Sequence, residues 1–179
     1  YTEMVAREGM IALMSSNAAP SMAPWGGAEA FTGTNPIAIA MYTGRDLLFS
    51  ADMATSVVAR GKIRQSARRG KPIPADWAMD ENGNPTTDPN EALKGTLLPM
   101  GGPKGSAIAL AVDILSGMVA GAKHAPDIKS FHNLDGATGV GASLAAIDIS
   151  KFMSLEAYKV EMDAYIASLK VMKKAGSAT

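Results

Sequence analysis

The stretch LLPMGGPKGSAIALAVDILSGMVAG, residues 97–121, constrains the fold of this chain more than any other. It predicts a helix from Pro103 to about Val119, because proline is favoured at the first helical position, where no N–H group is left unpaired. The predicted helix is apolar on nearly all sides, so we expect the rest of the protein to bury it. The apolar run within it is interrupted by Asp113 and is shorter than the about 20 residues of a membrane span.

The segments around this helix alternate between predicted strands and predicted helices. Strands are expected at 10–15, 36–41, 47–51 and 142–149, and further helices at the N-terminus, after residue 55 and from residue 155 to about 174. Thr55 or Ser56 is the predicted N-cap of the second helix, and Gly9 and Gly70 are predicted to follow helix ends. Asn82-Gly83 indicates a tight turn. This alternation predicts an α/β fold built from layers.

Composition narrows the class of protein further. The length of 179 residues suggests one domain or one large lobe. Lys and Arg total 17, as do Asp and Glu, so the formal net charge is zero and nothing indicates a nucleic-acid or anionic-membrane partner. The chain contains no cysteine, which excludes disulfides and thiolate zinc sites and is compatible with a cytoplasmic protein.

The glycines before the central helix do not form a known nucleotide-binding motif. A P-loop requires a lysine directly after its last glycine, whereas Lys104 precedes Gly105. A dinucleotide fingerprint requires three glycines between a strand and a helix, and Gly139-x-Gly141 has Leu144 where the third would stand.

The local chemistry of this helix start nevertheless favours an anion. Free N–H groups and the helix dipole attract negative charge there. Lys104 lies in the first turn, where the dipole disfavours a cation, so a bound anion would compensate. In the alternative interpretation, Gly-Gly-Pro only starts a buried helix and Lys104 is solvated.

Other polar residues carry weaker hypotheses. Thr34 and Asn35 precede a buried strand and are predicted to face a substrate cleft, although an Asn-Pro turn can also satisfy its own backbone. His124 and His132 lie in loops and do not predict a metal site. The second helix is basic, which fits either a solvated face or contact with a cofactor phosphate; its cations are Arg60, Lys62, Arg64, Arg68 and Arg69.

Five stretches taken in order resemble the type 2 malate/L-lactate dehydrogenase family. They are PWGG at 24–27, GTNPIAIA at 33–40, DMATSVVARGKI at 52–63, the segment from GKPIPADWAMD to NPTTDP at 70–89, and LLPMGGPKG at 97–105. The resemblance covers nearly the whole chain.

The resemblance implies an oxidoreductase that transfers a hydride between NAD or NADP and a small-molecule 2-oxo or 2-hydroxy acid. It implies a non-Rossmann NAD(P)-binding domain with a layered mixed or largely antiparallel sheet flanked by helices, in a cytoplasmic homodimer. It also implies a set of cofactor-binding residues. These are Leu48, Phe49, Ser50, Ala51, Asp52, Met53, Ala54, Pro103 and Lys104.

Two departures from the family pattern limit the assignment. Ala18 stands where some members carry a serine that contacts the cofactor. The family's catalytic histidines and substrate-binding arginine would lie upstream of Tyr1, so we assign no catalytic residue and expect this chain to be the cofactor-binding lobe of a longer dehydrogenase. Two alternatives are a non-catalytic nucleotide-binding or scaffold subunit, and a phosphotransferase, for which an acidic magnesium cluster beside the glycine loop is missing.

Overall fold

The computed structural model describes residues 1–45, 48–174 and 176. The first part of the chain forms α1 (Thr2–Arg7), β1 (Met10–Ser16), β2 (Ile37–Met41), β3 (Phe49–Met53) and α2 (Arg60–Arg68). The middle forms β4 (Ala78–Met79), α3 (Pro89–Lys94), β5 (Thr96–Leu97) and α4 (Pro103–Asp113), which continues as the π-helical turn η1 (Ile114–Val119). The last part forms β6 (Ala142–Asp148), the short 3₁₀ helix η2 (Ile149–Lys151) and α5 (Leu155–Lys170).

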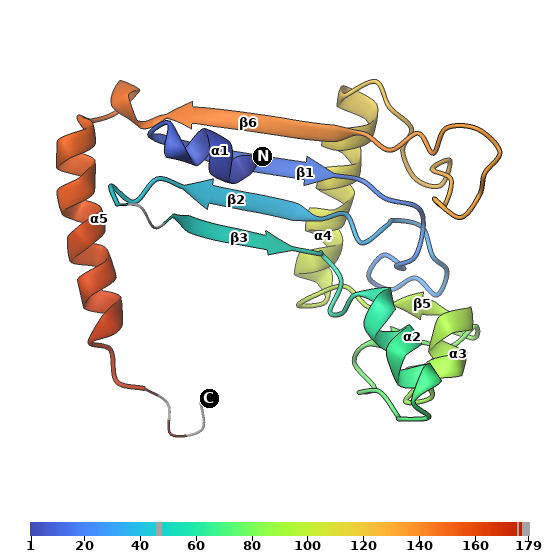
Figure 1. The fold of residues 1–179 in the computed structure, drawn as a ribbon. Helices are drawn as coiled ribbons and strands as arrows, with labels where there is room; N and C mark the ends of the chain where they lie inside the picture. Colours follow the sequence, from blue (N-terminus) through green and yellow to red (C-terminus); the bar gives the residue numbers. More distant parts are fainter. Residues whose placement is uncertain (46–47, 175, 177–179) are drawn as a thin grey trace. The chain divides into compact units, whose positions relative to one another are not determined.

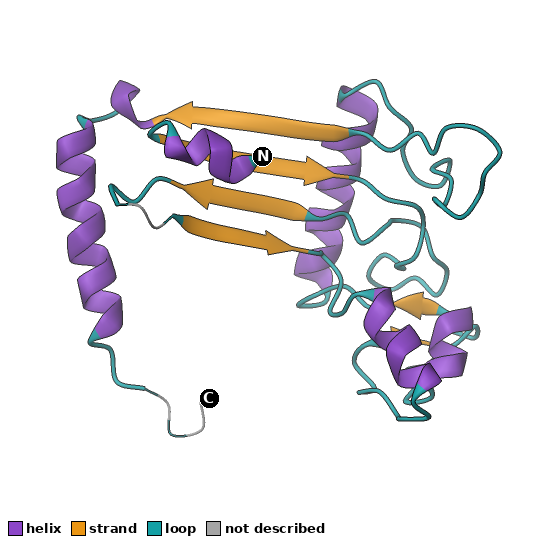
Figure 2. Ribbon diagram, viewed as in Figure 1, coloured by secondary structure: helices purple, strands orange, loops and turns teal. Residues whose placement is uncertain are grey.

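The main sheet has four strands in the order β3-β2-β1-β6. Neighbouring arrows run in opposite directions in Figure 1, so the sheet is antiparallel. The chain contains helices as well as strands (Figure 2). This arrangement differs from the parallel sheet of a Rossmann domain. The predicted non-Rossmann α/β fold is therefore confirmed. A second sheet pairs β4 with β5 in antiparallel register, with Ala78 opposite Leu97.

The chain divides into two compact units. Unit 1 comprises Tyr1–Leu13, Ala38–Ala51 and Ala145–Thr179, and unit 2 comprises Met14–Ile37 and Asp52–Leu144. The hydrophobic core of unit 2 centres on the fully buried side chains of Met22, Ile63 and Leu97. In unit 1, Gly9 ends α1 with a φ of 78°, as predicted, and Ser154 caps α5 by accepting a hydrogen bond from the N–H of Ala157.

The second helix begins later than predicted. α2 starts at Arg60, and Ala59 is its N-cap without a side-chain hydrogen bond. The hydroxyl of Thr55 donates to the carbonyl of Thr34 at 2.9 Å, and that of Ser56 donates to the carbonyl of Val58 at 2.8 Å. Both hydroxyls therefore bind loop carbonyls instead of capping the helix, and the prediction that one of them is the N-cap is wrong.

The expectation that α4 and η1 are buried on all sides is wrong within this chain. Ile114, Leu115, Met118 and Val119 keep 48–72% of their surface exposed. The buried side carries mainly small residues, which are Gly105, Ser106, Ala109, Ser116 and Gly117. These permit close approach: a Cβ on Gly105 would lie 2.1 Å from the carbonyl oxygen of Met100. The small face therefore contacts the protein, and the large side chains point outward.

The helix α3 was absent from the sequence-based expectations, although its start carries a local signal. Asp88 is the N-cap and accepts a hydrogen bond from the N–H of Asn90 at 2.8 Å. Pro89 follows at the first helical position. An N-cap aspartate followed by proline is a standard helix start, so the sequence carries a local signal for α3.

Candidate functional site

Unit 2 brings together three of the segments that the sequence singled out. The N–H of Thr55 donates to the carbonyl of Thr34 at 2.9 Å, and the N–H of Met100 donates to the carbonyl of Thr55 at 2.9 Å. Thr34 and the 52–54 segment therefore lie beside the loop that leads into α4. This arrangement depends on backbone hydrogen bonds between residues up to 45 positions apart (100 − 55 = 45).

The start of α4 has the geometry that the sequence suggested. Gly101 and Gly102 have φ values of 60° and 62°, a left-handed conformation that glycine adopts without strain, and Pro103 is the first helical residue. Ser106 anchors this turn, because its hydroxyl oxygen accepts a hydrogen bond from the N–H of Trp25 at 2.9 Å. Lys104 is exposed and forms no ion pair within the part of the chain that the structure describes.

The two residues predicted to meet the substrate have different surroundings. Thr34 lines a cavity of unit 2. Asn35 is fully buried with a φ of 22°; its Oδ1 accepts from the N–H of Ala18 at 3.1 Å, and its Nδ2 donates to the carbonyl of Ala109 at 2.8 Å. Asn35 therefore joins the loop after β1 to α4. Contact of either residue with substrate stays a prediction.

The predicted cofactor segment 48–54 is divided between the units. Asp52, Met53 and Ala54 belong to unit 2, whereas the residues from Leu48 to Ala51 belong to unit 1. Phe49 and Ser50 are exposed, and Ala51 is half-buried. The cofactor contacts of this segment stay predictions.

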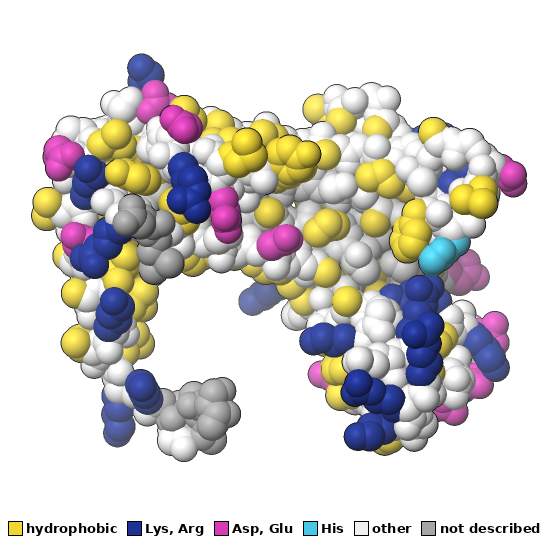
Figure 3. Space-filling model, viewed as in Figure 1, with side chains coloured by type: hydrophobic (Ala, Val, Ile, Leu, Met, Phe, Trp, Pro, Cys, Tyr) yellow, Lys and Arg dark blue, Asp and Glu magenta, His cyan; other side chains and the backbone are white. Residues whose placement is uncertain are grey.

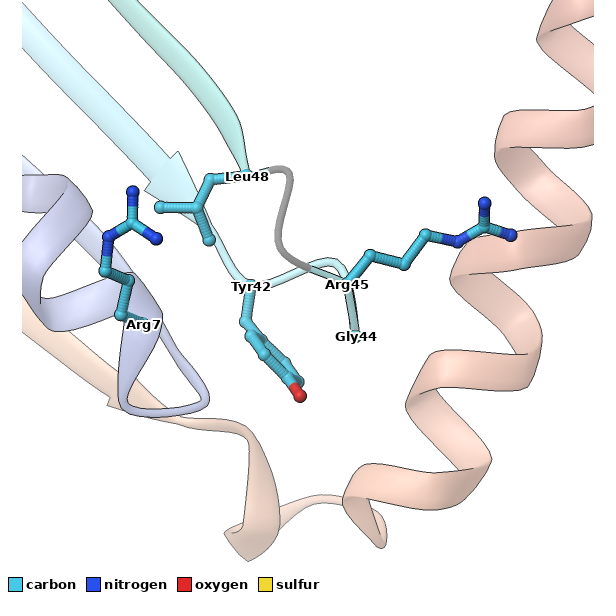
Figure 4. A pocket seen from close by; sticks show the side chains of 5 residues that line it. All are labelled: Arg7, Tyr42, Gly44, Arg45 and Leu48. Carbon is cyan, nitrogen blue, oxygen red and sulfur yellow. The ribbon is translucent and has the colours of Figure 1, made fainter.

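Leu48 lines a cavity of unit 1, together with Arg7, Tyr42, Gly44 and Arg45 (Figure 4). The side chain of Arg45 extends toward α5, where its Nε lies 2.6 Å from a carboxylate oxygen of Asp163. This hydrogen-bonded pair raises the pKa of the Arg45 guanidinium and lowers the pKa of the Asp163 carboxyl.

The unit 2 cavity that Thr34 lines, called the cavity of unit 2 below, has a volume of about 600 Å³. Ala18, Ala54 and Thr34 line it together with Arg60 and Arg64 of α2, and with the loop that carries Lys129, Phe131 and His132. Lys and Arg side chains gather over the α2–α3 region of the surface (Figure 3). The α2 cations were predicted from the sequence as possible phosphate contacts. That the 129–132 loop lines the same cavity was not predicted, because no local pattern links segments so far apart.

Arg60 is the most constrained cation of this cavity. It is half-buried, and one of its Nη atoms donates to the carbonyl of Leu93. Burial lowers the pKa of its guanidinium, and the neighbouring positive charge of Arg64 lowers it further. Two guanidinium groups of like charge at one cavity favour an anionic ligand between them.

A buried polar network holds the loop that lines the cavity. The carboxylate of Asp113 accepts hydrogen bonds from Nδ2 of Asn17 at 3.1 Å and from the N–H of Ala125 at 3.0 Å. Asn17 also accepts from the N–H of Gly141 at 2.9 Å and donates to the carbonyl of Lys123 at 2.8 Å. Asn17 and Asp113 therefore tie both ends of the 121–141 loop to β1 and α4, a role that sequence analysis missed.

The two histidines do not lie in a common cluster. Nδ1 of His124 lies 3.0 Å from the carbonyl oxygen of Ala125, and the ring of His132 lies 4.2 Å, centroid to centroid, from that of Phe131 at an interplanar angle of 45°. Over residues 1–45, 48–174 and 176, no group of three or more His, Cys, Asp or Glu side chains is arranged to hold a metal ion. No helix within those ranges has both the length and the apolar character needed to cross a membrane.

Comparison with known proteins identifies relatives along the whole chain. The profile of the malate/L-lactate dehydrogenase family matches residues 1–179. The chain is 40% identical over 170 residues to a malate/(S)-sulfolactate dehydrogenase from Methanothermus fervidus, covering 95% of this chain and 50% of that protein. It is 43% identical over 152 residues to a (2R)-3-sulfolactate dehydrogenase (NADP(+)) from Chromohalobacter salexigens, covering 84% of this chain and 45% of that protein.

The fold agrees with these relatives. The sulfolactate dehydrogenase from Methanocaldococcus jannaschii superposes with a TM-score of 0.91 at 40% identity, covering 99% of this chain and 51% of that structure. The chain spans about half the length of the curated relatives that it matches. These relatives are named as dehydrogenases, which does not favour the alternative of a non-catalytic scaffold subunit.

Proposed function

Because the chain belongs to the malate/L-lactate dehydrogenase family, we propose that it forms the cofactor-binding lobe of a longer oxidoreductase. The enzyme transfers a hydride between NAD or NADP and a small 2-oxo or 2-hydroxy acid of the malate, lactate or sulfolactate type. We further propose that it acts as a cytoplasmic homodimer. The names of relatives as malate and sulfolactate dehydrogenases, one of them NADP(+)-dependent, support the reaction class.

One observation carries this proposal: the backbone bonds that join Thr34, Thr55 and Met100. They join Thr55, which follows the predicted cofactor segment 52–54, to Met100, which precedes the predicted cofactor residues Pro103 and Lys104. The chemistry of this region fits a dinucleotide. The pyrophosphate is anionic, and Lys104 is an exposed cation in the first turn of α4, where the helix dipole also attracts negative charge.

The residues of this chain bind and orient the reactants in the proposed enzyme. Lys104 and the first turn of α4 hold the pyrophosphate, while Asp52, Met53 and Ala54 line the cofactor. Thr34 lines the same cavity as Ala54, and we propose that its hydroxyl contacts the substrate. A nicotinamide cofactor held by these residues would supply or accept the hydride exchanged with carbon 2 of the acid.

The test uses the full-length polypeptide that contains this chain. NADH and NADPH are offered with oxaloacetate, pyruvate and 3-sulfopyruvate, and loss of nicotinamide absorbance is followed, with succinate as a control that lacks the oxo group. We expect turnover of at least one 2-oxo acid at about 1 s⁻¹ or more. Absence of NADH and NADPH binding in a fluorescence titration would refute the proposed function.

A further inference from the structure

The charged side chains that line the cavity of unit 2 are all basic. Arg60, Arg64 and Lys129 line it together with His132, and none of its lining residues is an Asp or Glu. No ion pair to Arg60, Arg64 or Lys129 occurs within residues 1–45, 48–174 and 176. Three cations converging on one cavity repel each other unless an anion enters it, so the lining selects a ligand with negative charge.

Two of these three cations are held by hydrogen bonds to carbonyl groups of residues that do not line the cavity. Arg60 is tied to the carbonyl of Leu93 on α3, and Nζ of Lys129 donates to the carbonyl of Asp135 at 2.6 Å. Carbonyl contacts hold the two side chains in place without neutralising their charge. A cation held in position loses less conformational entropy when it binds an anion than a freely moving one.

The same cavity offers an aromatic ring and empty space beside the cations. Phe131 is 75% exposed, and its ring lies next to that of His132. The lining also includes the small side chains of Ala18, Ala19 and Ala54. An exposed aromatic ring is a stacking surface for a nucleobase, and small side chains leave room for a ribose.

The charge of the cavity, its aromatic ring and its exposure to solvent together indicate which part of the cofactor it would bind. The reacting end must be shielded from water, whereas Arg64, Phe131 and His132 are all exposed. A solvent-facing, cationic and aromatic site suits the adenosine end. Unmodified adenosine is neutral, whereas the 2′-phosphate of NADP supplies the negative charge that the lining selects.

Building on the proposed function, we propose that this cavity binds the 2′-phosphorylated adenosine of NADP. Arg60, Arg64 and Lys129 contact the 2′-phosphate, and the base stacks on Phe131. These residues set a preference for NADP over NAD. The acid group of the substrate is the other source of an anion, and the experiment distinguishes the two.

The first arm measures binding without catalysis. Adenosine 2′,5′-bisphosphate and adenosine 5′-monophosphate are titrated into the wild-type full-length protein by isothermal calorimetry. We expect the bisphosphate to bind about 10-fold or more tightly, because charge-assisted hydrogen bonds to the extra phosphate are available only to it. Equal affinities would overturn the inference.

The second arm assigns the preference to side chains. Arg64→Gln and Lys129→Gln are compared with Arg68→Gln, which removes an exposed charge from the same helix outside the cavity. Arg60 is kept because its contact with Leu93 contributes to the fold. Each cavity variant should weaken NADPH binding about 10-fold, with NADH affinity almost unchanged, and Arg68→Gln should leave the NADPH-to-NADH ratio unaltered.

Each other outcome has a defined meaning. Equal weakening of NADH and NADPH would place these cations at the pyrophosphate and overturn the inference. A raised KM for the 2-oxo acid with an unchanged cofactor ratio would assign the cavity to the substrate and also overturn it. A wild-type protein that binds NADH and NADPH equally refutes only this inference, whereas one that binds neither refutes the proposed function as well.

Discussion

Lys104 occupies a position that its own helix disfavours. It lies in the first turn of α4, whose N-terminal end carries partial positive charge, and the first turn contains no acidic residue to offset it. Neighbouring Ser106 and Gly105 are buried, while Lys104 is exposed. The lysine therefore contributes little to the fold and is available to an anionic ligand.

For Lys104→Ala we expect cofactor affinity to fall about 10–100-fold, because a hydrogen bond to a charged group is lost. The stability of the free protein should stay constant or rise slightly. The effect should shrink at high salt, since screening weakens the wild-type interaction. NADH fluorescence titration measures it, with Lys62→Ala on the exposed face of α2 as the control. Wild-type affinity in the variant would show that Lys104 does not touch the cofactor.

Asn35→Ala should destabilise the protein by about 2–4 kcal/mol. The substitution removes the amide group, so the buried N–H of Ala18 and the carbonyl of Ala109 each lose their hydrogen bond to Asn35. It also places alanine at a positive φ. Urea unfolding gives the value, and Asn90→Ala on the exposed surface of α3 should change it by less than about 0.5 kcal/mol. Similar losses in both variants would contradict a framework role for Asn35.

At the scale of elements, α4 depends on close backbone approach. Gly105 lies where a Cβ would meet the carbonyl of Met100 at 2.1 Å, and Gly117 in η1 lies where a Cβ would meet Nδ2 of Asn17 at 2.8 Å. The helix is thereby held against the loops that carry the proposed site. In α2, by contrast, no atom lies within 4 Å of a Cβ built on Gly61.

Two glycine-to-alanine substitutions in helices should therefore have opposite signs. Gly105→Ala should destabilise by about 3 kcal/mol or more, since α4 must move away from Met100. Gly61→Ala should stabilise by about 0.5–1 kcal/mol, because it lowers the entropy of the unfolded chain without a clash. The free energies of unfolding in urea test the pair. Stabilisation by Gly105→Ala would contradict the close packing of α4 against Met100.

For the whole molecule, burial is unevenly distributed. Unit 2 contains the fully buried side chains of Met22, Ile63 and Leu97, whereas α5 in unit 1 has no buried residue along its length. Local opening requires less free energy where few apolar contacts must break. The two units should therefore differ in how readily their amides exchange with solvent.

Hydrogen exchange of the 179-residue chain tests this difference. Amides of α5 should exchange about 10-fold or more faster than those around Met22 and Leu97, whose N–H groups bond to the carbonyls of Thr32 and Ser21. Amides of the exposed 131–136 loop provide the fast reference. Protection of α5 equal to that of the unit 2 core would contradict the expectation.

Local features of the sequence determined where most elements begin and end. Gly9 ends α1 because glycine reaches positive φ without strain, Pro103 starts α4 because it lacks an N–H group, and Ser154 caps α5. The family was readable too, because its five motifs are contiguous stretches in order. The anion-binding hypothesis for Lys104 also needed only neighbouring residues.

Tertiary structure alone decided what these elements meet. Thr55 looked like a helix cap, but its hydroxyl binds the carbonyl of Thr34, an acceptor that chain folding brings near. The face of α4 with large apolar side chains points outward, because the face with small side chains packs closely against backbone. Arg64 and Lys129, 65 positions apart (129 − 64 = 65), line one cavity because the Asn17–Asp113 network holds the intervening loop. Hydrogen bonds and packing between distant segments cannot be predicted from a local sequence pattern. Such a pattern reports only the secondary-structure preference of neighbouring residues.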